Sequence, residues 1–193
     1  MLIGVTGGFC SGKTTVSTFF KQLGAQVIDA DKIVHMLYRD NGKVKNLILK
    51  EFGKSVFSKK GVDRKRLAAV VLRSRRELKR LCDIVHPVVI REITAMAKRS
   101  TKHVVVVDAA LLIETKLAGT CDVVVVVKAG LKRRLNNCLN KGYARRDLFK
   151  RQALQLPLKE KLKAADHIID NNGTKSDLKK EAVKIWAKLT KES

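Results

Sequence analysis

The chain has 193 residues, a length that suits one domain with a buried core and argues against two full-size domains. Hydrophobic residues make up 45% and charged residues 31%, with only 2 Pro and 12 Gly, which excludes collagen-like, linker-like and disordered chains. Lys and Arg number 41 against 18 Asp and Glu, a formal net charge of +23. Such a surface concentrates polyanions, so the partner is expected to carry phosphates, whether in a nucleotide, a nucleic acid or an acidic lipid.

The sequence predicts a cytoplasmic protein without a membrane span. Its longest apolar runs, at 104–107 and 123–127, fall far short of the roughly 18 residues that suggest a spanning helix, and residues 1–5 lack the basic start of a signal peptide. The cysteines form no C-x-x-C pair, so we expect neither a zinc site nor a disulfide framework, and four thiols in a reducing cytosol. These are Cys10, Cys82, Cys121 and Cys138.

Five short segments rich in Val and Ile predict the strands of a parallel sheet. Each is nearly continuous in apolarity, as is typical of strands covered on both faces. In chain order they are Leu2–Thr6, Ala25–Asp29, His103–Asp108, Asp122–Lys128 and His167–Asp170.

Between these strands, apolar residues recur at helical spacing, and the alternation of strand and helix predicts an α/β fold. One helix is expected after the first strand, one in the middle of the chain, and an amphipathic one at its end. Their apolar positions are Val16, Phe19, Phe20 and Leu23; Leu78, Leu81, Ile84 and Val85; and Leu178, Ala182, Val183, Ile185, Trp186 and Leu189. Trp186 is therefore expected to pack in the core.

Two long insertions interrupt the alternation. A largely helical stretch over 32–98 separates the second and third strands, and a very basic stretch over 132–163 precedes the last strand. Both are too long for plain connections and are typical of elements that close over a ligand. We expect one domain over 1–193, with a core made of 1–31, 99–131 and 164–193, a helical subdomain over 32–98, and a lid over 132–163.

The strongest motif lies between the first strand and the first helix, where G-x-x-x-x-G-K-[ST] predicts a phosphate-binding P-loop. Its residues are Gly7, Gly8, Phe9, Cys10, Ser11, Gly12, Lys13 and Thr14. The glycines allow a tight turn with exposed N–H groups, and the positive end of the following helix adds to the anion site. Lys13 would reach the β and γ oxygens of a triphosphate, and the Thr14 hydroxyl would bind Mg²⁺. A glycine-rich turn with a chance lysine is the weaker interpretation, given the strand and helix on either side.

Acidic residues end three of the predicted strands, and the carboxyl ends of a parallel sheet line the ligand crevice. If the second strand continued past Asp29, Asp31 would face the same way as Asp29. We choose Asp31 as the general base or orienting acceptor for an attacking hydroxyl, with the N-cap of a helix beginning at Lys32 as the alternative. Asp108 has the form of a Walker B acid that holds Mg²⁺, or is an ordinary strand-ending aspartate.

Other polar residues give weaker signals. Asp63–Arg64 and His86–Pro87 lie in the helical insertion, where an arginine could grip a phosphate, although each pair also suits a surface turn or a helix end. The histidines show no metal or triad spacing. The basic residues of the second insertion would either clamp ATP phosphates or form a solvated face; they are Lys132, Arg133, Arg134, Lys141, Arg145, Arg146, Lys150 and Arg151.

Together these residues resemble the dephospho-coenzyme A kinase family, and the resemblance covers nearly the whole chain. Several of the matching segments are specific to that family, unlike the P-loop. They are Gly4–Gly8 with Ser11–Thr14, Val27–Asp31 with His35, Asp63–Arg64 with Leu67, His86–Pro87, Asp108 with Leu111–Glu114, Arg151 with Gln155, and Ala165–Asn171.

The resemblance implies a nucleotide-kinase-like P-loop fold, with a five-stranded parallel sheet flanked by helices, a helical insertion that binds the acceptor, and a basic lid. It also implies the last step of coenzyme A biosynthesis, in which the γ-phosphoryl of ATP passes to the ribose 3′-hydroxyl of dephospho-CoA in the presence of Mg²⁺. Small-molecule substrates are then the expected partners, rather than nucleic acid or a membrane, and the enzyme is expected to be a monomer or weak homo-oligomer.

Carried onto this sequence, the resemblance implies that Asp31 is the catalytic base and that Lys13 stabilises the γ-phosphate. The residues implied for ATP are Gly7, Gly8, Cys10, Ser11, Gly12, Lys13, Thr14, Thr15, Lys141 and Arg151. Those implied for the acceptor are Asp31, His35, Arg64, His86, Asp108 and Leu111, and those implied for Mg²⁺ are Thr14 and Asp108.

Three positions depart from the family pattern. Cys10 stands where Gly is common, and a thiol at a helix N-terminus is expected to have a low pKa and to be sensitive to oxidation. The lid pattern usually carries two arginines four residues apart, which align here with Asn137 and Lys141, and lysine lacks the planar fork of arginine. Ala110 replaces a usual proline.

Other functions fit parts of the sequence. A P-loop kinase of another small substrate, such as a nucleoside or nucleotide, would differ only in its acceptor site. A nucleic-acid-binding P-loop ATPase would use the positive charge on a phosphodiester backbone and show steep salt dependence, but only Tyr143 and Phe149 interleave the basic clusters as stacking platforms. A non-catalytic scaffold would not need Lys13, Thr14 and Asp31.

Overall fold

The computed structural model describes residues 1–59 and 61–191. They divide into two units, the first made of residues 1–29 with 95–191 and the second of residues 30–59 with 61–94.

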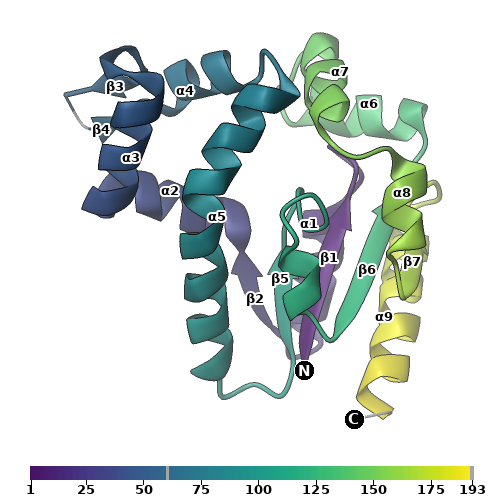
Figure 1. Ribbon diagram of the computed structural model, residues 1–193. Coiled ribbons are helices and arrows are strands. Elements are labelled where there is room, and N and C mark those ends of the chain that lie inside the picture. The colour runs from purple at the N-terminus through teal and green to yellow at the C-terminus, as the bar shows by residue number, and fades with distance from the viewer. Residues whose placement is uncertain (60, 192–193) are drawn as a thin grey trace. The chain divides into compact units, whose positions relative to one another are not determined.

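The first unit is built on a five-stranded parallel sheet in the order β2-β5-β1-β6-β7 (Figure 1). Its strands are β1 (Leu2–Gly7), β2 (Gln26–Asp29), β5 (Val105–Asp108), β6 (Val123–Lys128) and β7 (His167–Asp170). All five predicted strands are therefore confirmed to within two residues, and so is the α/β class. The β1 strand lies at the centre of the sheet, which places the loop that follows it at the middle of the carboxyl edge.

One face of this sheet is covered by α1 (Lys13–Gln22) and α9 (Lys175–Lys191), which pack against each other. Apolar side chains of β1, β6 and both helices form one buried cluster, and the Phe20 and Trp186 rings lie with their centroids 5.8 Å apart. The expectation that Trp186 packs in the core is thus confirmed. The prediction that Val183 belongs to the apolar stripe of α9 was wrong, because Val183 is 39% exposed. It lies about 140° around the helix from the buried Leu178.

The other face of β1 is covered by the segment that follows β5. Leu112 is fully buried there, and a Cβ added to Gly4 would come within 2.6 Å of a Leu112 methyl carbon. Gly4 therefore allows this segment, which ends in the short 3-10 helix η2 (Leu117–Thr120), to lie directly on the central strand.

The basic insertion forms three short helices in the first unit. These are α6 (Leu131–Asn140), α7 (Arg145–Leu154) and α8 (Leu158–Lys163). The α6 and α7 helices pack together, and Leu148 of α7 is fully buried beside Cys138 of α6.

The second unit is mostly helical. Its elements are α2 (Ala30–Asp40), α3 (Gly42–Phe52), η1 (Lys54–Val56), a small hairpin of β3 (Phe57–Ser58) and β4 (Gly61–Val62), α4 (Arg64–Val71) and most of α5 (Arg75–Lys98). Asn41 caps α3 by accepting from the Val44 N–H, and Asp63 caps α4 by accepting from Lys65 and Arg66. The helix-end interpretation of Asp63–Arg64 is therefore confirmed.

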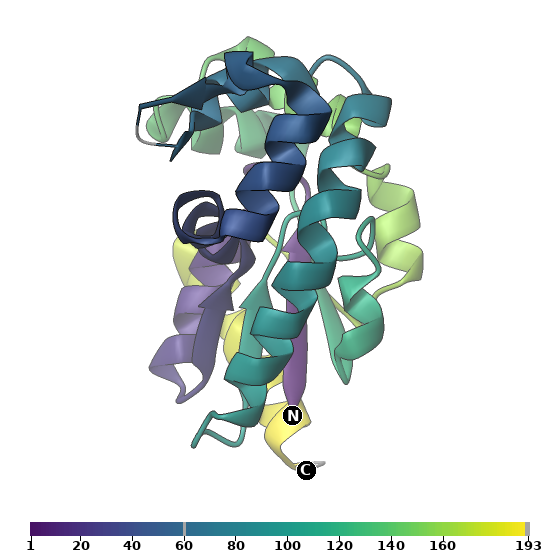
Figure 2. The ribbon, with the colours of Figure 1, turned by 60° about the vertical axis from the view of Figure 1, so that its left-hand side comes forward.

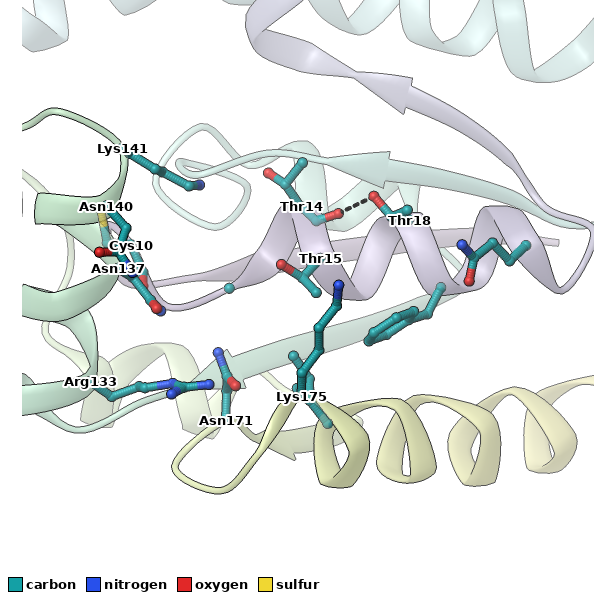
Figure 3. A pocket seen from close by; sticks show the side chains of 14 residues that line it. Cys10, Thr14, Thr15, Thr18, Arg133, Asn137, Asn140, Lys141, Asn171 and Lys175 are labelled. Carbon is teal, nitrogen blue, oxygen red and sulfur yellow. Dashed lines mark hydrogen bonds between the residues drawn. The ribbon is translucent and has the colours of Figure 1, made fainter.

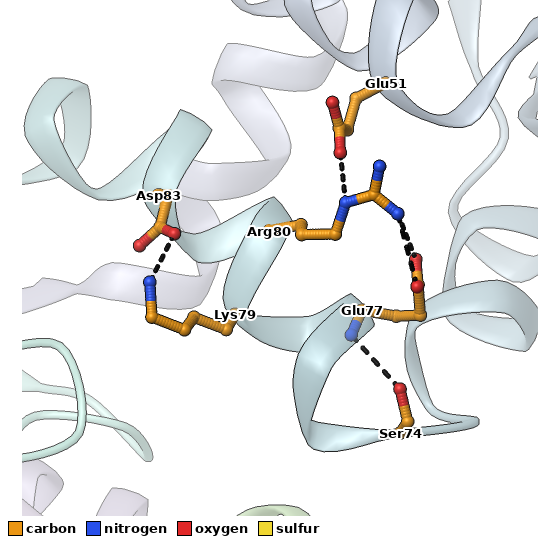
Figure 4. A network of polar contacts seen from close by, with 6 residues as sticks. All are labelled: Glu51, Ser74, Glu77, Lys79, Arg80 and Asp83. Carbon is orange, nitrogen blue, oxygen red and sulfur yellow. Dashed lines mark hydrogen bonds and ion pairs between the residues drawn. The ribbon is translucent and has the colours of Figure 1, made fainter.

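Exposed ion pairs join the helices of this unit (Figure 4). Arg80 of α5 pairs with Glu51 of α3 and also, at 3.3 Å, with Glu77 one turn earlier. Lys79 pairs with Asp83 at 2.6 Å along the same helix. Because these side chains are partly or largely exposed, we expect the pairs to add little to stability.

The α5 helix has 24 residues and runs without a break in Figure 2. It contains Pro87, so the alternative that placed His86–Pro87 in a turn or at a helix end is wrong. The apolar positions Leu81, Val85, Val89 and Ile93, at a spacing of four, are buried, and this packing outweighs the cost of a proline inside a helix. Among residues 1–59 and 61–191, no helix is both long and apolar enough to cross a membrane.

Candidate active site

The predicted P-loop joins β1 to α1 in the first unit. Gly7 has a φ of 154°, and a Cβ there would collide with the backbone carbonyl of Val127 on β6. Gly12 has a φ of 100° and stands at the N-cap of α1, where a Cβ would collide with the Asn171 side chain. Both positions therefore require glycine. The first turn of α1 points its backbone N–H groups and partial positive charge at the loop, as an anion site needs.

Side chains from outside the loop hold its carbonyl groups. Three donors each bind one of three consecutive carbonyl oxygens: Arg134 Nε to Phe9 at 2.9 Å, Asn137 Nδ2 to Cys10 at 2.9 Å, and Asn171 Nδ2 to Ser11 at 2.8 Å. The donors come from α6 and from the end of β7. Since a carbonyl and the N–H of its own peptide point in opposite directions, these contacts help to turn loop N–H groups toward a ligand.

Gln155 connects the P-loop to the segment after β5. Its Oε1 accepts from the Phe9 N–H at 2.8 Å, and its Nε2 donates to the Ala110 carbonyl at 3.0 Å. The side chain is only 6% exposed, so water cannot easily replace either bond. Gln155 thus acts on the loop's conformation and is a positioning residue.

Gln155→Leu should raise the KM for ATP about tenfold, because the Phe9 N–H would be left buried without its partner and the Ala110 carbonyl would lose one of its donors. Steady-state kinetics against ATP would measure the change. Gln152→Leu, at an exposed position in α7 three residues before Gln155, is the matched control. Equal KM values in the two variants would show that Gln155 does not position the loop.

The expectation of four thiols is wrong. Cys10 and Cys138 form a disulfide, with Cα atoms 5.6 Å apart, whereas Cys82 and Cys121 are not disulfide-bonded. The oxidation-sensitive Cys10 thiol is likewise wrong for this state, since its sulfur is already bonded. The two residues are separated by 128 positions in sequence and meet only because α6 lies beside the loop. Burial raises the pKa of the Cys121 thiol to about 11.

A cavity of about 520 Å³ opens beside the loop, a size that suits a nucleotide. Figure 3 shows side chains reaching it from α1, α6 and the start of α9. The charged residues of its lining are all cationic, with Arg133, Lys141 and Lys175 placed around Thr14 and Thr15. Lys175 was not anticipated, because its only sequence signal was one more lysine in a basic helix.

Five of the predicted ATP residues lie outside the cavity lining: Gly7, Gly8, Ser11, Lys13 and Arg151. Arg151 has its guanidinium 4.9 Å from the centroid of the Phe9 ring and 5.5 Å from that of Tyr143. It thus supports the loop through cation–π contacts. Arg134 is 8% exposed, its guanidinium lies against Gly8, and burial lowers its pKa.

Buried polar atoms around the loop fit an anionic ligand. Ser11 Oγ, Arg133 Nε and Arg134 Nη2 have no hydrogen-bond partner among the described residues. Because buried donors are nearly always satisfied, a phosphate oxygen is a natural partner for such groups.

Asp108 ends β5 at the carboxyl edge of the sheet, where it is paired in register with Val5 of β1 and Asp29 of β2. Asp108 therefore lies at the end of the strand adjacent to β1, the strand that leads into the P-loop, as expected of a Walker B acid. Leu111 is partly buried beyond it. Among the described residues no cluster of three metal-binding side chains occurs, which still fits Mg²⁺, since this ion takes one or two protein ligands and completes its shell with water and phosphate oxygens.

A buried ion pair supports the segments around the loop. Lys161 of α8 is 1% exposed and donates to Glu114 Oε1 and to the Ala110 carbonyl, both at 2.8 Å. Glu114 also accepts from the Leu156 N–H. Burial lowers the pKa of Lys161, against the opposing effect of Glu114. Sequence analysis missed Lys161, which is one of many lysines in a basic segment.

Lys161→Met should lower the free energy of unfolding by about 3 to 5 kcal/mol, because Glu114 would keep a largely buried charge without its partner. Urea unfolding followed by circular dichroism would measure the loss. The exposed Lys163→Met, which breaks a surface pair with Glu160, is the control and should cost at most about 1 kcal/mol. Similar losses in both variants would mean that the buried pair has no special role.

In the second unit, the structure places Asp31 in the first turn of α2, where its side chain is exposed. The helix begins at Ala30, so the alternative of an N-cap for a helix beginning at Lys32 is wrong. Because β2 ends at Asp29 and α2 begins at Ala30, Asp31 does not lie in a continuation of the strand. The chain turns into the helix directly after Asp29.

The other predicted acceptor residues of this unit lie on three helices: His35 on α2, Arg64 at the start of α4, and His86 on α5. Arg64 and Asp31 both act electrostatically on the buried Tyr38, whose pKa is raised mainly by burial. Burial also lowers the pKa of His86 and so favours the neutral imidazole, whereas the nearby Asp83 acts in the opposite direction.

A P-loop after the central strand of a parallel five-stranded sheet, beside a cationic cavity, defines a nucleotide-binding protein of the P-loop kinase class. The dephospho-CoA kinase family model matches residues 1–177. The chain therefore belongs to the dephospho-CoA kinase family.

Individual relatives agree with this assignment. The chain is 34% identical over 192 residues to the dephospho-CoA kinase of Aquifex aeolicus, covering 98% of both chains. A crystal structure from Thermus thermophilus matches with a TM-score of 0.82 at 30% identity, covering 98% of this chain and 97% of the other. The dephospho-CoA kinase of Campylobacter jejuni matches with a TM-score of 0.68 at 26% identity, covering 99% and 98%.

Proposed function

We propose that this protein transfers the γ-phosphoryl group of ATP to the ribose 3′-hydroxyl of dephospho-CoA, giving CoA and ADP. The observation that carries the proposal is family membership over residues 1–177, joined to a P-loop whose carbonyl groups are held by side chains and whose cavity is cationic. The fold thus provides the ATP site, and the family provides the acceptor.

The nucleotide would be bound and activated by the first unit. Lys13 and the N-terminus of α1 would stabilise the charge that spreads over the transferred phosphoryl group. Arg133, Lys141 and Lys175 would bind the remaining negative charge of the nucleotide from the cavity wall. Thr14 and Asp108 would hold Mg²⁺, which screens the charge of the β- and γ-phosphates when bound.

The acceptor would be bound by the second unit. Asp31 would orient the 3′-hydroxyl and accept its proton as the phosphoryl group is transferred. Arg64 would pair with a phosphate of dephospho-CoA, and His35 and His86 would complete the site. We place this chemistry in the cytoplasm, in a monomer or weak homo-oligomer that needs neither nucleic acid nor a membrane.

The test is a coupled assay of ADP release with dephospho-CoA, adenosine, AMP and RNA as separate acceptors. Dephospho-CoA should give by far the highest kcat/KM, and mass spectrometry should find a product heavier by one phosphoryl group at the ribose 3′ position. Faster transfer to adenosine or AMP would identify another small-substrate kinase. ADP release stimulated by RNA without a phosphorylated product would identify a nucleic-acid-dependent ATPase.

A further inference from the structure

The Cys10–Cys138 disulfide joins the phosphate-binding loop to the helix that forms the opposite wall of the cavity. Cys10 lies within the loop, and Cys138 lies in the last turns of α6. Their Cα separation of 5.6 Å is typical of disulfides. Phe9, Leu135 and the buried Leu148 pack around the pair, so the bond lies inside a small apolar cluster of the first unit.

Cys10 is an unusual residue for its backbone conformation. Its φ is 62°, in the left-handed region that a non-glycine residue occupies only at a cost. Two contacts with α6 hold it there, the bond to Cys138 and the hydrogen bond from Asn137 Nδ2 to the Cys10 carbonyl, in addition to the turn closed by the Ser11 N–H and the Gly8 carbonyl. Without the disulfide, Cys10 would lose one of the restraints on this conformation.

The same helix carries cationic groups of the nucleotide cavity. Arg133 on α6 and Lys141 at its C-terminal end both line the cavity, as does Asn137. The disulfide therefore fixes the loop that would bind the phosphates relative to the cations that would bind the rest of the nucleotide. A preformed site binds its ligand more tightly than one that must first be ordered.

We propose that Cys10 and Cys138 are a reversible thiol–disulfide site whose redox state sets the affinity of the protein for nucleotides, with the disulfide state binding more tightly. The proposal rests on the proposed function only in assuming that a nucleotide binds at the P-loop. It does not depend on the acceptor.

The exchange reaction needs only a low-molecular-weight disulfide or dithiol. In oxidation, one protein thiolate attacks the small disulfide and releases its first thiol, and the second protein thiolate then attacks the mixed disulfide and releases the other. Two protein thiols lose two electrons in total, and one small disulfide becomes two thiols. Reduction by a dithiol runs the same steps in reverse. Cys10 lines the cavity and is 6% exposed whereas Cys138 is fully buried, so Cys10 is the sulfur that a reagent reaches.

The experiment measures the Kd of a non-hydrolysable ATP analogue with Mg²⁺ by titration calorimetry, on the same preparation before reduction, after dithiothreitol and after re-oxidation with oxidised glutathione. Reduction should raise the Kd at least about fivefold, and re-oxidation should restore it. Cys138→Ser should resemble the reduced protein and ignore dithiothreitol. The double variant Cys82→Ser/Cys121→Ser, which retains the pair, should respond like the parent.

A reciprocal measurement separates this site from a disulfide that is merely structural. Saturating nucleotide should shift the thiol–disulfide equilibrium in a glutathione buffer toward the disulfide by the same factor by which oxidation lowers the Kd. Equal Kd values in the two states would overturn the proposal, as would peptide mapping that finds Cys10 not bonded to Cys138 after oxidation. If the two Kd values are equal and kinase activity is intact, only the redox proposal fails and the proposed function stands. If no nucleotide binds in either redox state, both the redox proposal and the proposed function fail.

Discussion

Lys13→Met should lower kcat for phosphoryl transfer by about 10²- to 10³-fold, the loss typical of removing one group that stabilises transition-state charge. Lys13 is the first residue of α1 and follows the glycine whose left-handed backbone ends the P-loop. Its ammonium would bind the β and γ oxygens, where negative charge moves as the γ-phosphoryl group leaves. Methionine keeps most of the length of the side chain and removes the charge.

The measurement is steady-state kinetics with both substrates saturating, together with the Kd of an ATP analogue. Lys21→Met, an exposed lysine in the last turn of the same helix, removes the same charge away from the loop and should leave kcat unchanged. If Lys13→Met and Lys21→Met lowered kcat equally, the effect would come from net charge, and the assigned role of Lys13 would be wrong.

The sheet could be predicted from sequence because each strand carries its own signal. Runs such as 104–107 and 123–127 are apolar on both faces, and the structure buries them between covering segments. The P-loop could be predicted for a similar reason, since the conformations of Gly7 and Gly12 exclude other residues and so fix the motif. The strands and the P-loop could therefore be predicted because each is determined by residues within one short segment of the chain.

Errors arose where tertiary contacts decide the outcome. His86–Pro87 suits a helix end by local rules, yet apolar contacts on both sides of Pro87 keep it inside α5. Asp31 was placed by extending a strand that in fact turns into α2 after Asp29. Val183 matched a helical period but faces solvent, because the four buried positions of α9 already fill the stripe.

The contacts that shape the candidate site were the least predictable part. Cys10 and Cys138 are 128 residues apart, and the donors to the loop carbonyls, Arg134, Asn137 and Asn171, come from segments distant in sequence. No local pattern indicates that an asparagine binds one given carbonyl. Asn137 stands where the family usually has an arginine, and only the structure explains this difference. Its side chain donates a hydrogen bond to the carbonyl of Cys10, beside the disulfide.

Asp31→Asn should lower kcat by about 10²- to 10⁴-fold, the usual contribution of a general base, while the affinity for ATP stays unchanged. Asparagine keeps the shape of the side chain but cannot accept the proton of the 3′-hydroxyl. Since Asp31 stands in the first turn of α2, outside the unit that holds the P-loop and its cavity, the change should leave nucleotide binding intact.

The matched control is Asp40→Asn, at the other end of the same helix, where the carboxylate is exposed and pairs with Arg39. It changes net charge equally and should retain full kcat. The decisive comparison is kcat at saturating ATP and dephospho-CoA. A higher KM with an unchanged kcat would indicate that Asp31 contributes to substrate binding and not to proton transfer. If Asp31→Asn turned over as fast as Asp40→Asn, phosphoryl transfer would not require a carboxylate at this position. Positioning of the hydroxyl next to the P-loop would then have to account for catalysis, as the loose transition state of phosphoryl transfer allows.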